Sequence, residues 1–257
     1  SNVGGAQPWD GATANWAASG SAVGLGNIWR FPYIAQENGG GIFLFVYLLA
    51  ILFIGLPIIL AEFALGRATA QNAVGAYRAI SKRWAFLGYW AVFVCFGVLA
   101  YFYVISGWTL AYMAKAVTGD LTSAPFKDFL ADPKSQIFYT VIFALLPITV
   151  VAFGVRKGIE RMAEVLLPLF VVLLVGMFVH SLLKLGSNEG LRYLFTPDVS
   201  KLNAKTALFA VGQAFFSLSI GMGVMITYGS YQRKSDNLMT SSIAVTAFNT
   251  LVAILAA

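Results

Sequence analysis

The chain is 257 residues long, with 59% hydrophobic and only 11% charged residues. Ordinary soluble domains carry about 25% charged residues, so this composition excludes an ordinary soluble domain and predicts a protein that spans a membrane. The net charge of +6 comes from 17 Lys and Arg against 11 Asp and Glu. Its basic residues cluster in short segments between apolar runs, as in proteins whose charges orient membrane helices, so no nucleic-acid partner is expected.

Seven apolar segments follow one another along the chain and predict seven membrane helices. Only helices fit, because lipid leaves backbone polar groups to be satisfied within each segment, and these runs are too long and too uniformly apolar for barrel strands. The last segment reaches Ala257 without a closing polar loop. We therefore expect residues 1–257 to form a single but incomplete transmembrane domain, with helices over 11–36, 41–68, 86–114, 136–153, 162–183, 206–231 and 238–257.

The loops between these segments alternate in charge. The short loops 66–84, 154–161 and 229–237 are rich in Arg and Lys, whereas the longer loops 115–135 and 184–205 mix Asp, Glu and Lys. The positive-inside rule assigns the short basic loops, and with them the N-terminus, to the cytoplasm. No secretory signal is apparent at the N-terminus, so we expect a multi-pass protein of the cell's inner (plasma) membrane.

The first and sixth segments are both rich in small residues near their middle, at SGSAVGLGN (19–27) and SLSIGMG (217–223). Glycine costs about 1 kcal/mol relative to alanine inside a helix. Close packing between helices would explain one such cluster. Two clusters in separate segments favour helices unwound at mid-membrane, whose freed carbonyls suit sodium and whose freed amides suit a carboxylate. The two segments begin successive five-helix sets, which would be related by inverted topology.

Four polar side chains lie inside the apolar runs. Asn27 and Asn249 either form helix-packing hydrogen bonds or, beside the breaks, provide oxygen ligands. Glu62 is an intramembrane acid and therefore a functional candidate; it either carries a proton or, as we favour, accepts hydrogen bonds from amides of an unwound neighbour. Arg30 either snorkels to the interface or closes a pathway.

The stretch GSAVGLGNIWRFPYIAQENGGGIFLFVYLL, followed by GLPIILAEFALGR, resembles the neurotransmitter:sodium symporter family, whose bacterial members carry amino acids. The similarity continues through GWTLAY (107–112), FFSLSIGMGVMITYGSY (215–231) and the Asn of TAFN (246–249). It implies an all-α integral membrane fold, a leucine-transporter-like inverted-repeat bundle with helices 1 and 6 broken at mid-membrane. The chain would cover about the first six and a half helices. The leucine transporter of this family is itself the standard example of paired breaks, so the break pattern is not independent support.

The resemblance also implies residue roles. Two sodium ions would bind at the breaks, the first to Ala22, Asn27, Ser217, Asn249 and the substrate carboxylate, and the second to Gly20, Val23 and ligands beyond this chain. The substrate would bind at Ser21, Ala22, Leu25, Gly26, Val98, Phe102, Phe216, Ser217, Ser219 and Met222, with its carboxylate on the amides of Leu25 and Gly26. Arg30 would be the extracellular gate, and Glu62 would hold the unwound part of helix 6.

Three positions depart from the family's pattern. Phe102 stands where a tyrosine usually donates to the substrate carboxylate. Trp9 and Asp10 occupy the region of a basic residue that usually helps to close the cytoplasmic gate. Tyr47, Gln213 and Ser217 resemble parts of the family's chloride site, but Ala253 is neither the acid of chloride-independent relatives nor the serine of chloride-dependent ones, which leaves chloride undecided.

The sequence therefore predicts sodium-coupled symport of a neutral, apolar or aromatic amino acid by alternating access. The alternatives are a sodium-insensitive amino-acid sensor or channel on the same scaffold, or a truncated fragment that does not transport. An enzyme is not expected, because no nucleophile–base pair, metal cluster or phosphate loop is apparent. Membrane lipid and a small-molecule amino acid are the expected partners, and a homodimer is a further possibility.

Overall fold

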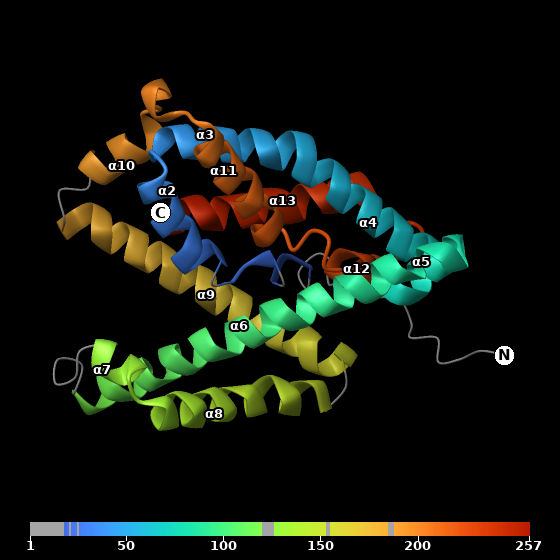
Figure 1. The fold of residues 1–257 in the computed structure, drawn as a ribbon, viewed down its shortest axis with the longest axis horizontal. Helices are drawn as coiled ribbons and strands as arrows, with labels where there is room; N and C mark the ends of the chain where they lie inside the picture. The colour runs from blue at the N-terminus through green and yellow to red at the C-terminus, as the bar shows by residue number, and fades with distance from the viewer. Residues whose placement is uncertain (1–17, 21, 25, 120–125, 153–154, 185–187) are drawn as a thin grey trace. The chain divides into compact units, whose positions relative to one another are not determined.

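A computed structural model of the chain describes residues 18–20, 22–24, 26–119, 126–152, 155–184 and 188–257 (Figure 1). Apart from one isolated bridge between Gly40 and Pro197, the described residues form helices and turns. The chain divides into two compact units, residues 1–92 with 162–257, and residues 93–161. This confirms the all-α fold that the sequence predicts.

The first unit contains both broken helices. Its elements are η1 (Gly26–Arg30), α2 (Phe31–Glu37), α3 (Gly41–Ala50), η2 (Ile51–Gly55), α4 (Leu56–Thr69), α5 (Ala73–Ile80), η3 (Lys82–Trp84), α10 (Asn188–Phe195), η4 (Val199–Lys201), α11 (Ala204–Ser217), α12 (Val224–Tyr231) and α13 (Leu238–Ala256). The second unit contains α7 (Phe126–Leu130) and α8 (Pro133–Ala152). The long helices α6 (Ala85–Thr118) and α9 (Val155–Lys184) each have residues in both units.

Among the described residues, five continuous helical stretches are long and apolar enough to cross a membrane: Gly41–Thr69, Lys82–Thr118, Pro133–Ala152, Glu164–Leu183 and Leu238–Ala256. Large apolar side chains on them are exposed, including Phe53 at 70% and Phe96 at 68%. A water-soluble monomer rarely exposes so much contiguous apolar surface, and lipid is the solvent that suits it.

Asparagine side chains fix the start of three helices in the first unit. Asn72 accepts a hydrogen bond from the Gly75 amide at α5, and Asn203 accepts one from the Thr206 amide at α11. Asn237 accepts hydrogen bonds from two amides at the start of α13. Such caps satisfy N–H groups that have no partner inside the helix, and each contributes about 1 kcal/mol.

The sixth apolar segment is broken where the glycines predict it. The helix α11 ends at Ser217, turns occupy residues 218–223, and α12 begins at Val224 (Figure 1). Ser219, Gly221 and Gly223 have φ angles of 54°, 79° and 71°, a left-handed region that glycine enters without steric cost. The two glycines on either side of Met222 therefore allow the backbone to leave the helix at this point.

The first segment is interrupted as well. The described residues 18–20 are helical, residues 23 and 24 form a bend, and the helix η1 begins at Gly26 and continues into α2. The backbone N–H of Asn27 donates to the Gly24 carbonyl oxygen at 3.0 Å. This i to i−3 bond is a tighter turn than the i to i−4 pattern of an α-helix. Both segments thus have backbone that leaves the regular helical ladder.

The helices α4 and α12 approach each other through glycine on both sides. A Cβ atom on Gly66 would overlap the carbonyl oxygen of Ile226, and one on Gly229 would lie 2.6 Å from the carbonyl oxygen of Phe63. Small residues allow this close approach of backbones, which is a main source of helix association in membranes. It holds α12, the second half of the broken helix, against α4.

An aromatic cluster lies in the core of the first unit. Phe31, Phe43 and Tyr47 are fully buried, and the rings of Phe31 and Tyr47 have centroids 4.9 Å apart. Because Phe31 belongs to α2, and Phe43 and Tyr47 belong to α3, this packing fixes α2 against α3. In the second unit, Trp108 donates to the Gln136 side chain at 3.1 Å, which joins α6 to α8.

The glycine contact between α4 and α12 gives a direct test of the fold. We expect Gly66→Ala or Gly229→Ala to destabilise the protein by about 1–3 kcal/mol, because the added methyl group overpacks a backbone contact. Thermal unfolding in detergent measures this. The control is Gly176→Ala on α9, where a Cβ atom meets nothing within 4 Å; an equal loss of stability in the control would contradict the packing argument.

Candidate ion and substrate site at the helix breaks

Three buried polar side chains meet where the breaks lie, one from each of η1, α11 and α13. Asn27 Nδ2 donates to the side-chain oxygen of Asn249 at 2.8 Å and to its carbonyl oxygen at 3.0 Å. Ser217 Oγ donates to Asn27 Oδ1 at 3.1 Å. Asn27 and Asn249 are fully buried, and Ser217 is 2% exposed. Residues more than 180 positions apart in the sequence are thus joined at the two breaks.

Oxygen atoms converge beside this cluster. The Asn249 side-chain amide faces the carbonyl oxygens of Ala22 and Ser217. With its nitrogen toward them, it donates to Ala22 at 2.9 Å and to Ser217 at 3.2 Å, and its oxygen accepts from Ser217 Oγ at 2.8 Å. The amide therefore satisfies both carbonyls, and turned over it would present its own oxygen beside them.

The oxygen set identifies the type of ion that would fit. Carbonyl, amide and hydroxyl oxygens suit hard cations, and carbonyls of unwound helices bind sodium in transporters. Among the described residues, no group of three His, Cys, Asp or Glu side chains is placed to hold a metal ion. A site of neutral oxygens favours a monovalent over a divalent cation, whose higher charge requires carboxylates.

Arg30 connects the two broken segments at one side of this cluster. Its Nη1 donates to Gln213 Oε1 at 2.7 Å, and its guanidinium carbon lies 4.5 Å from the centroid of the Phe216 ring. Gln213 Nε2 in turn donates to the carbonyl oxygen of Gly26 at 3.0 Å. The side chain of Gln213 thereby ties α11 to η1, next to Asn27.

Glu62 supports the break in the sixth segment. One of its carboxylate oxygens accepts a hydrogen bond from the Gly221 amide at 2.8 Å. The other oxygen is buried and has no hydrogen-bond partner among the described residues. A freed amide at this depth requires such an acceptor, since lipid supplies none.

Part of the expected substrate pocket can be placed. Phe216 lies at the end of α11, and Ser219 and Met222 lie in the turns of the break; all three are half-buried. A Cβ atom on Gly24 or on Gly221, one in each break, would meet nothing within 4 Å. Backbone from both breaks therefore borders open space.

The other expected site residues fall into three groups. Ser21, Leu25, Trp9 and Asp10 lie outside the described residues. Val98 and Phe102 belong to the second unit. Gly20 and Val23, the expected second sodium site, are half-buried in the first segment, and the Val23 amide donates to Ser19.

The residues expected for chloride are adjacent to the oxygen cluster. The fully buried hydroxyl of Tyr47 faces the side chains of Ser217, Asn249 and Thr250 without a hydrogen bond of good geometry to any described residue. Gln213 already uses both ends of its amide, on Arg30 and on Gly26. Tyr47 is thus the donor of this trio whose hydroxyl is not committed elsewhere.

Two contacts at the breaks lie beyond the predictions from the sequence. Gln213, a chloride candidate, bonds Arg30 and the Gly26 carbonyl; it lies one helical turn before Ser217 and so on the same face of α11. The Gly221 amide, within the predicted break, is the group that Glu62 holds. Spacing alone indicated the first contact; nothing in the sequence indicated which freed amide would meet Glu62.

The family model of the sodium:neurotransmitter symporters matches residues 13–135 and 130–257. This chain belongs to that family. The match covers nearly the whole chain and includes both breaks, so the family and the fold predicted from the sequence are confirmed.

Named relatives agree with the family match. The chain is 39% identical to the uncharacterized sodium-dependent transporter YhdH of Bacillus subtilis, over 93% of this chain and 55% of that protein. It is 30% identical to the sodium-dependent neutral amino acid transporter B(0)AT2 of Bos taurus, over 93% of this chain and 38% of that protein. The chain therefore spans about half, or less, of the length of these relatives.

A solved structure is also similar. The crystal structure of MhsT in complex with L-phenylalanine matches 98% of this chain and 60% of that protein, with 44% identity and a TM-score of 0.91. At this identity and coverage, the chain shares the fold of that protein. The chain is therefore part of a transporter family and not of an enzyme family.

The contact between Glu62 and Gly221 gives a matched pair of variants. We expect Glu62→Leu to destabilise the protein by about 1–3 kcal/mol, because the Gly221 amide loses its acceptor in a buried place. Glu62→Gln keeps an acceptor oxygen and should retain most of the stability. Thermal unfolding in detergent compares the two, and equal losses would show that this hydrogen bond does not support the break.

Proposed function

We propose that the protein carries a neutral amino acid across the membrane by sodium-coupled symport and alternating access. The observation that supports this most is the cluster of Asn27, Ser217 and Asn249 beside the Ala22 carbonyl, where two broken helices bring oxygens together in the core. Membership in the family and the relatives named as sodium-dependent transporters support the same proposal. The whole protein's transport activity is part of the proposal.

The first sodium ion binds, in this proposal, to oxygens of Ala22, Asn27, Ser217 and Asn249. Binding turns the Asn249 oxygen toward the ion and holds the two breaks in one arrangement. The second sodium ion uses the carbonyls of Gly20 and Val23 with ligands that are not in this chain. Two ions would make substrate accumulation steeply dependent on sodium, because each binding event shifts the other.

The substrate binds between the breaks. Its carboxylate meets the amides of Leu25 and Gly26, at the N-terminal end of η1, where the helix dipole favours negative charge. Its side chain lies against Ser21, Val98, Phe216, Ser219 and Met222. A large apolar or aromatic side chain is the proposed cargo, in keeping with the phenylalanine in the MhsT structure.

Arg30 acts as the gate on the extracellular side, with the cation over the ring of Phe216 and bonded to Gln213. We infer an inner-membrane protein with its N-terminus in the cytoplasm, because the short loops are the basic ones. Lipid contact follows from the exposed apolar helices, and a homodimer remains a prediction. Chloride binding at Tyr47, Gln213 and Ser217 also remains a prediction; of the three, Tyr47 has the uncommitted donor.

Sodium replacement tests the proposal. In liposomes containing the full-length protein, we expect uptake of labelled L-phenylalanine driven by a sodium gradient to stop when choline replaces sodium. Asn249→Ala should raise the half-saturating sodium concentration at least about tenfold, the equivalent of one lost ligand at roughly 1.4 kcal/mol. The control is Thr149→Ala on α8, whose hydroxyl bonds only its own helix.

The outcomes separate the competing functions. Uptake that is unchanged in choline would overturn sodium coupling. Sodium-dependent binding of the amino acid without accumulation against a gradient would instead support the sensor or channel on the same scaffold. An equal shift in Asn249→Ala and Thr149→Ala would remove Asn249 from the sodium site.

Phe102 gives a test of substrate anchoring. We expect Phe102→Tyr to raise the apparent affinity for the amino acid about fivefold, because it returns a hydroxyl that can donate to the substrate carboxylate at about 1 kcal/mol. Competition binding measures this, with Tyr103→Phe as the neighbouring control. No change in Phe102→Tyr would show that Phe102 does not face the substrate.

A further inference from the structure

The turn between α2 and α3 is tightly held by the segment that precedes the broken sixth helix. This turn, Gly39–Gly41, lies against residues Tyr193–Lys201, which comprise the end of α10 and most of its connection to α11 (Figure 1). Gly40 forms an isolated antiparallel bridge with Pro197. We call these two segments together the clasp.

The clasp requires three consecutive glycines. A Cβ atom on Gly40 would lie 2.5 Å from the ring of Tyr193, and one on Gly41 would lie 2.7 Å from the Thr196 carbonyl. On Gly39 it would lie 3.0 Å from Lys201 Cβ. Gly39 and Gly40 also have φ angles of 96° and 59°, which side chains other than glycine adopt at a steric cost. The backbones approach too closely for any side chain.

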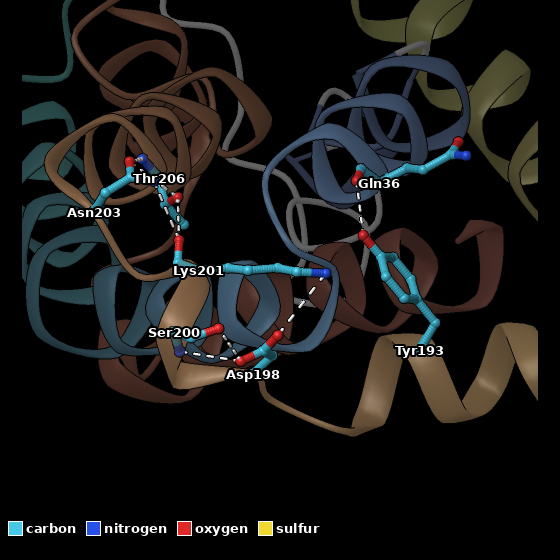
Figure 2. Close-up of polar contacts among 7 residues, drawn as sticks. All are labelled: Gln36, Tyr193, Asp198, Ser200, Lys201, Asn203 and Thr206. Atoms are coloured by element: carbon cyan, nitrogen blue, oxygen red, sulfur yellow. Dashed lines mark hydrogen bonds and ion pairs between the residues drawn. The ribbon is translucent and has the colours of Figure 1, made fainter.

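A hydrogen bond ties the clasp to the end of α2. The Tyr193 hydroxyl donates to the carbonyl oxygen of Gln36 at 2.8 Å (Figure 2). This carbonyl is one of the last in α2, which ends at Glu37, so no N–H group of the same helix can reach it. The ring of Tyr193 is in turn covered by the Lys201 ammonium, 5.7 Å from its centroid.

The segment is also braced on its other side, toward α11. Asp198 accepts hydrogen bonds from the Ser200 amide at 3.0 Å and hydroxyl at 2.6 Å, and lies 3.9 Å from Lys201 Nζ (Figure 2). The Ser200 hydrogen bonds hold the pKa of Asp198 below its ordinary value, so this acid stays charged at neutral pH. The Lys201 carbonyl accepts from Thr206, which Asn203 caps.

The clasp and the candidate site are linked through α2. This helix has seven residues and is about 10 Å long at 1.5 Å per residue. Arg30 and its hydrogen bond to Gln213 lie at one end, and Gln36 with its hydrogen bond to Tyr193 lies at the other. Since a short helix moves as a rigid body, its position at the clasp determines the position of Arg30 and Asn27.

We propose that the clasp is a positioning element that fixes the far end of α2, and that Tyr193 is its positioning residue for Arg30 and Asn27. The helix α2 would be held at both ends, by Gln213 of α11 near the break and by Tyr193 of α10 at the turn. The clasp keeps the first segment in the position that can bind the ion. If the clasp is loosened, fewer molecules have this position, and the apparent sodium affinity falls in proportion to their fraction. This functional consequence rests on the proposed sodium symport.

The first arm of the test measures position directly and needs no transport. Spin labels replace the exposed side chains Tyr33 on α2 and Leu208 on α11 in a full-length Cys95→Ser background, which removes the only cysteine of this chain. We expect a narrow distance distribution that broadens in Tyr193→Phe and more so in Gly40→Ala. Gly190→Ala on α10 is the control, because a Cβ atom there meets nothing within 4 Å.

The second arm measures sodium dependence in the proteins without labels. We expect Tyr193→Phe to raise the half-saturating sodium concentration about fivefold, the value of one hydrogen bond, with uptake at saturating sodium within about twofold of the parent protein. Tyr193→Phe keeps the ring and its packing, so it stays informative even where Gly40→Ala fails to fold. A purely structural role would lower the melting temperature without this sodium shift.

The two arms fail separately. Label distributions that are the same in Tyr193→Phe, Gly40→Ala and Gly190→Ala would overturn the clasp, whatever the protein transports. Broadened distributions in a parent protein without sodium-dependent uptake would uphold the clasp and overturn the proposed function. Broadened distributions with an unchanged sodium requirement would overturn the role of Tyr193 in positioning Asn27.

Discussion

Backbone polar groups at membrane depth must find partners inside the protein, and this requirement organises the structure around the two breaks. Lipid offers no donor or acceptor, and each buried unsatisfied group costs several kcal/mol. The freed Gly221 amide is met by Glu62, and the freed Gly26 carbonyl is met by Gln213. The Ala22 carbonyl faces the amide of Asn249. Glu62, Gln213 and Asn249 therefore each meet a backbone group of a broken helix.

Satisfying the breaks is not enough; the half-helices on either side must also be held. A half-helix of seven or eight residues, such as α2 or α12, cannot be stable alone. Each is instead pressed against a neighbour through glycine: α12 against α4 at Gly66 and Gly229, and the end of α2 against the α10–α11 segment at Gly39–Gly41. Glycine therefore has two opposite roles here, since it opens the helices at Gly221 and Gly223 and locks their halves elsewhere.

The sequence predicted the helices and the breaks well because both have local causes. Long apolar runs specify membrane helices, and clustered glycines specify where a ladder ends, so α11 stops at Ser217 as expected from SLSIGMG. Long-range pairings were harder. The pairing of Arg30 with Gln213, 183 positions apart, and that of Gly40 with Tyr193 depend on which helix faces which, and composition does not encode this. The family resemblance predicts that Asn27 and Asn249 lie together. Spacing alone does not distinguish an ion ligand from a helix-packing residue at either position.

Under the proposed symport, the neutral charge of the cluster gives a reason for ion and substrate to bind together. Its oxygens come from amides, a hydroxyl and carbonyls, and the nearest acid assigned to the breaks, Glu62, already directs one oxygen to Gly221. A cation bound there would keep its full positive charge in a region of low dielectric, where an uncompensated charge is strongly unfavourable. A substrate carboxylate beside the cation would remove that cost. A protein carboxylate in the cluster would remove it even without substrate, so that sodium could bind without the amino acid. Neutral ligands at Asn27, Ser217 and Asn249 would thus favour obligatory coupling of sodium and substrate binding, because the substrate carboxylate supplies the compensating negative charge.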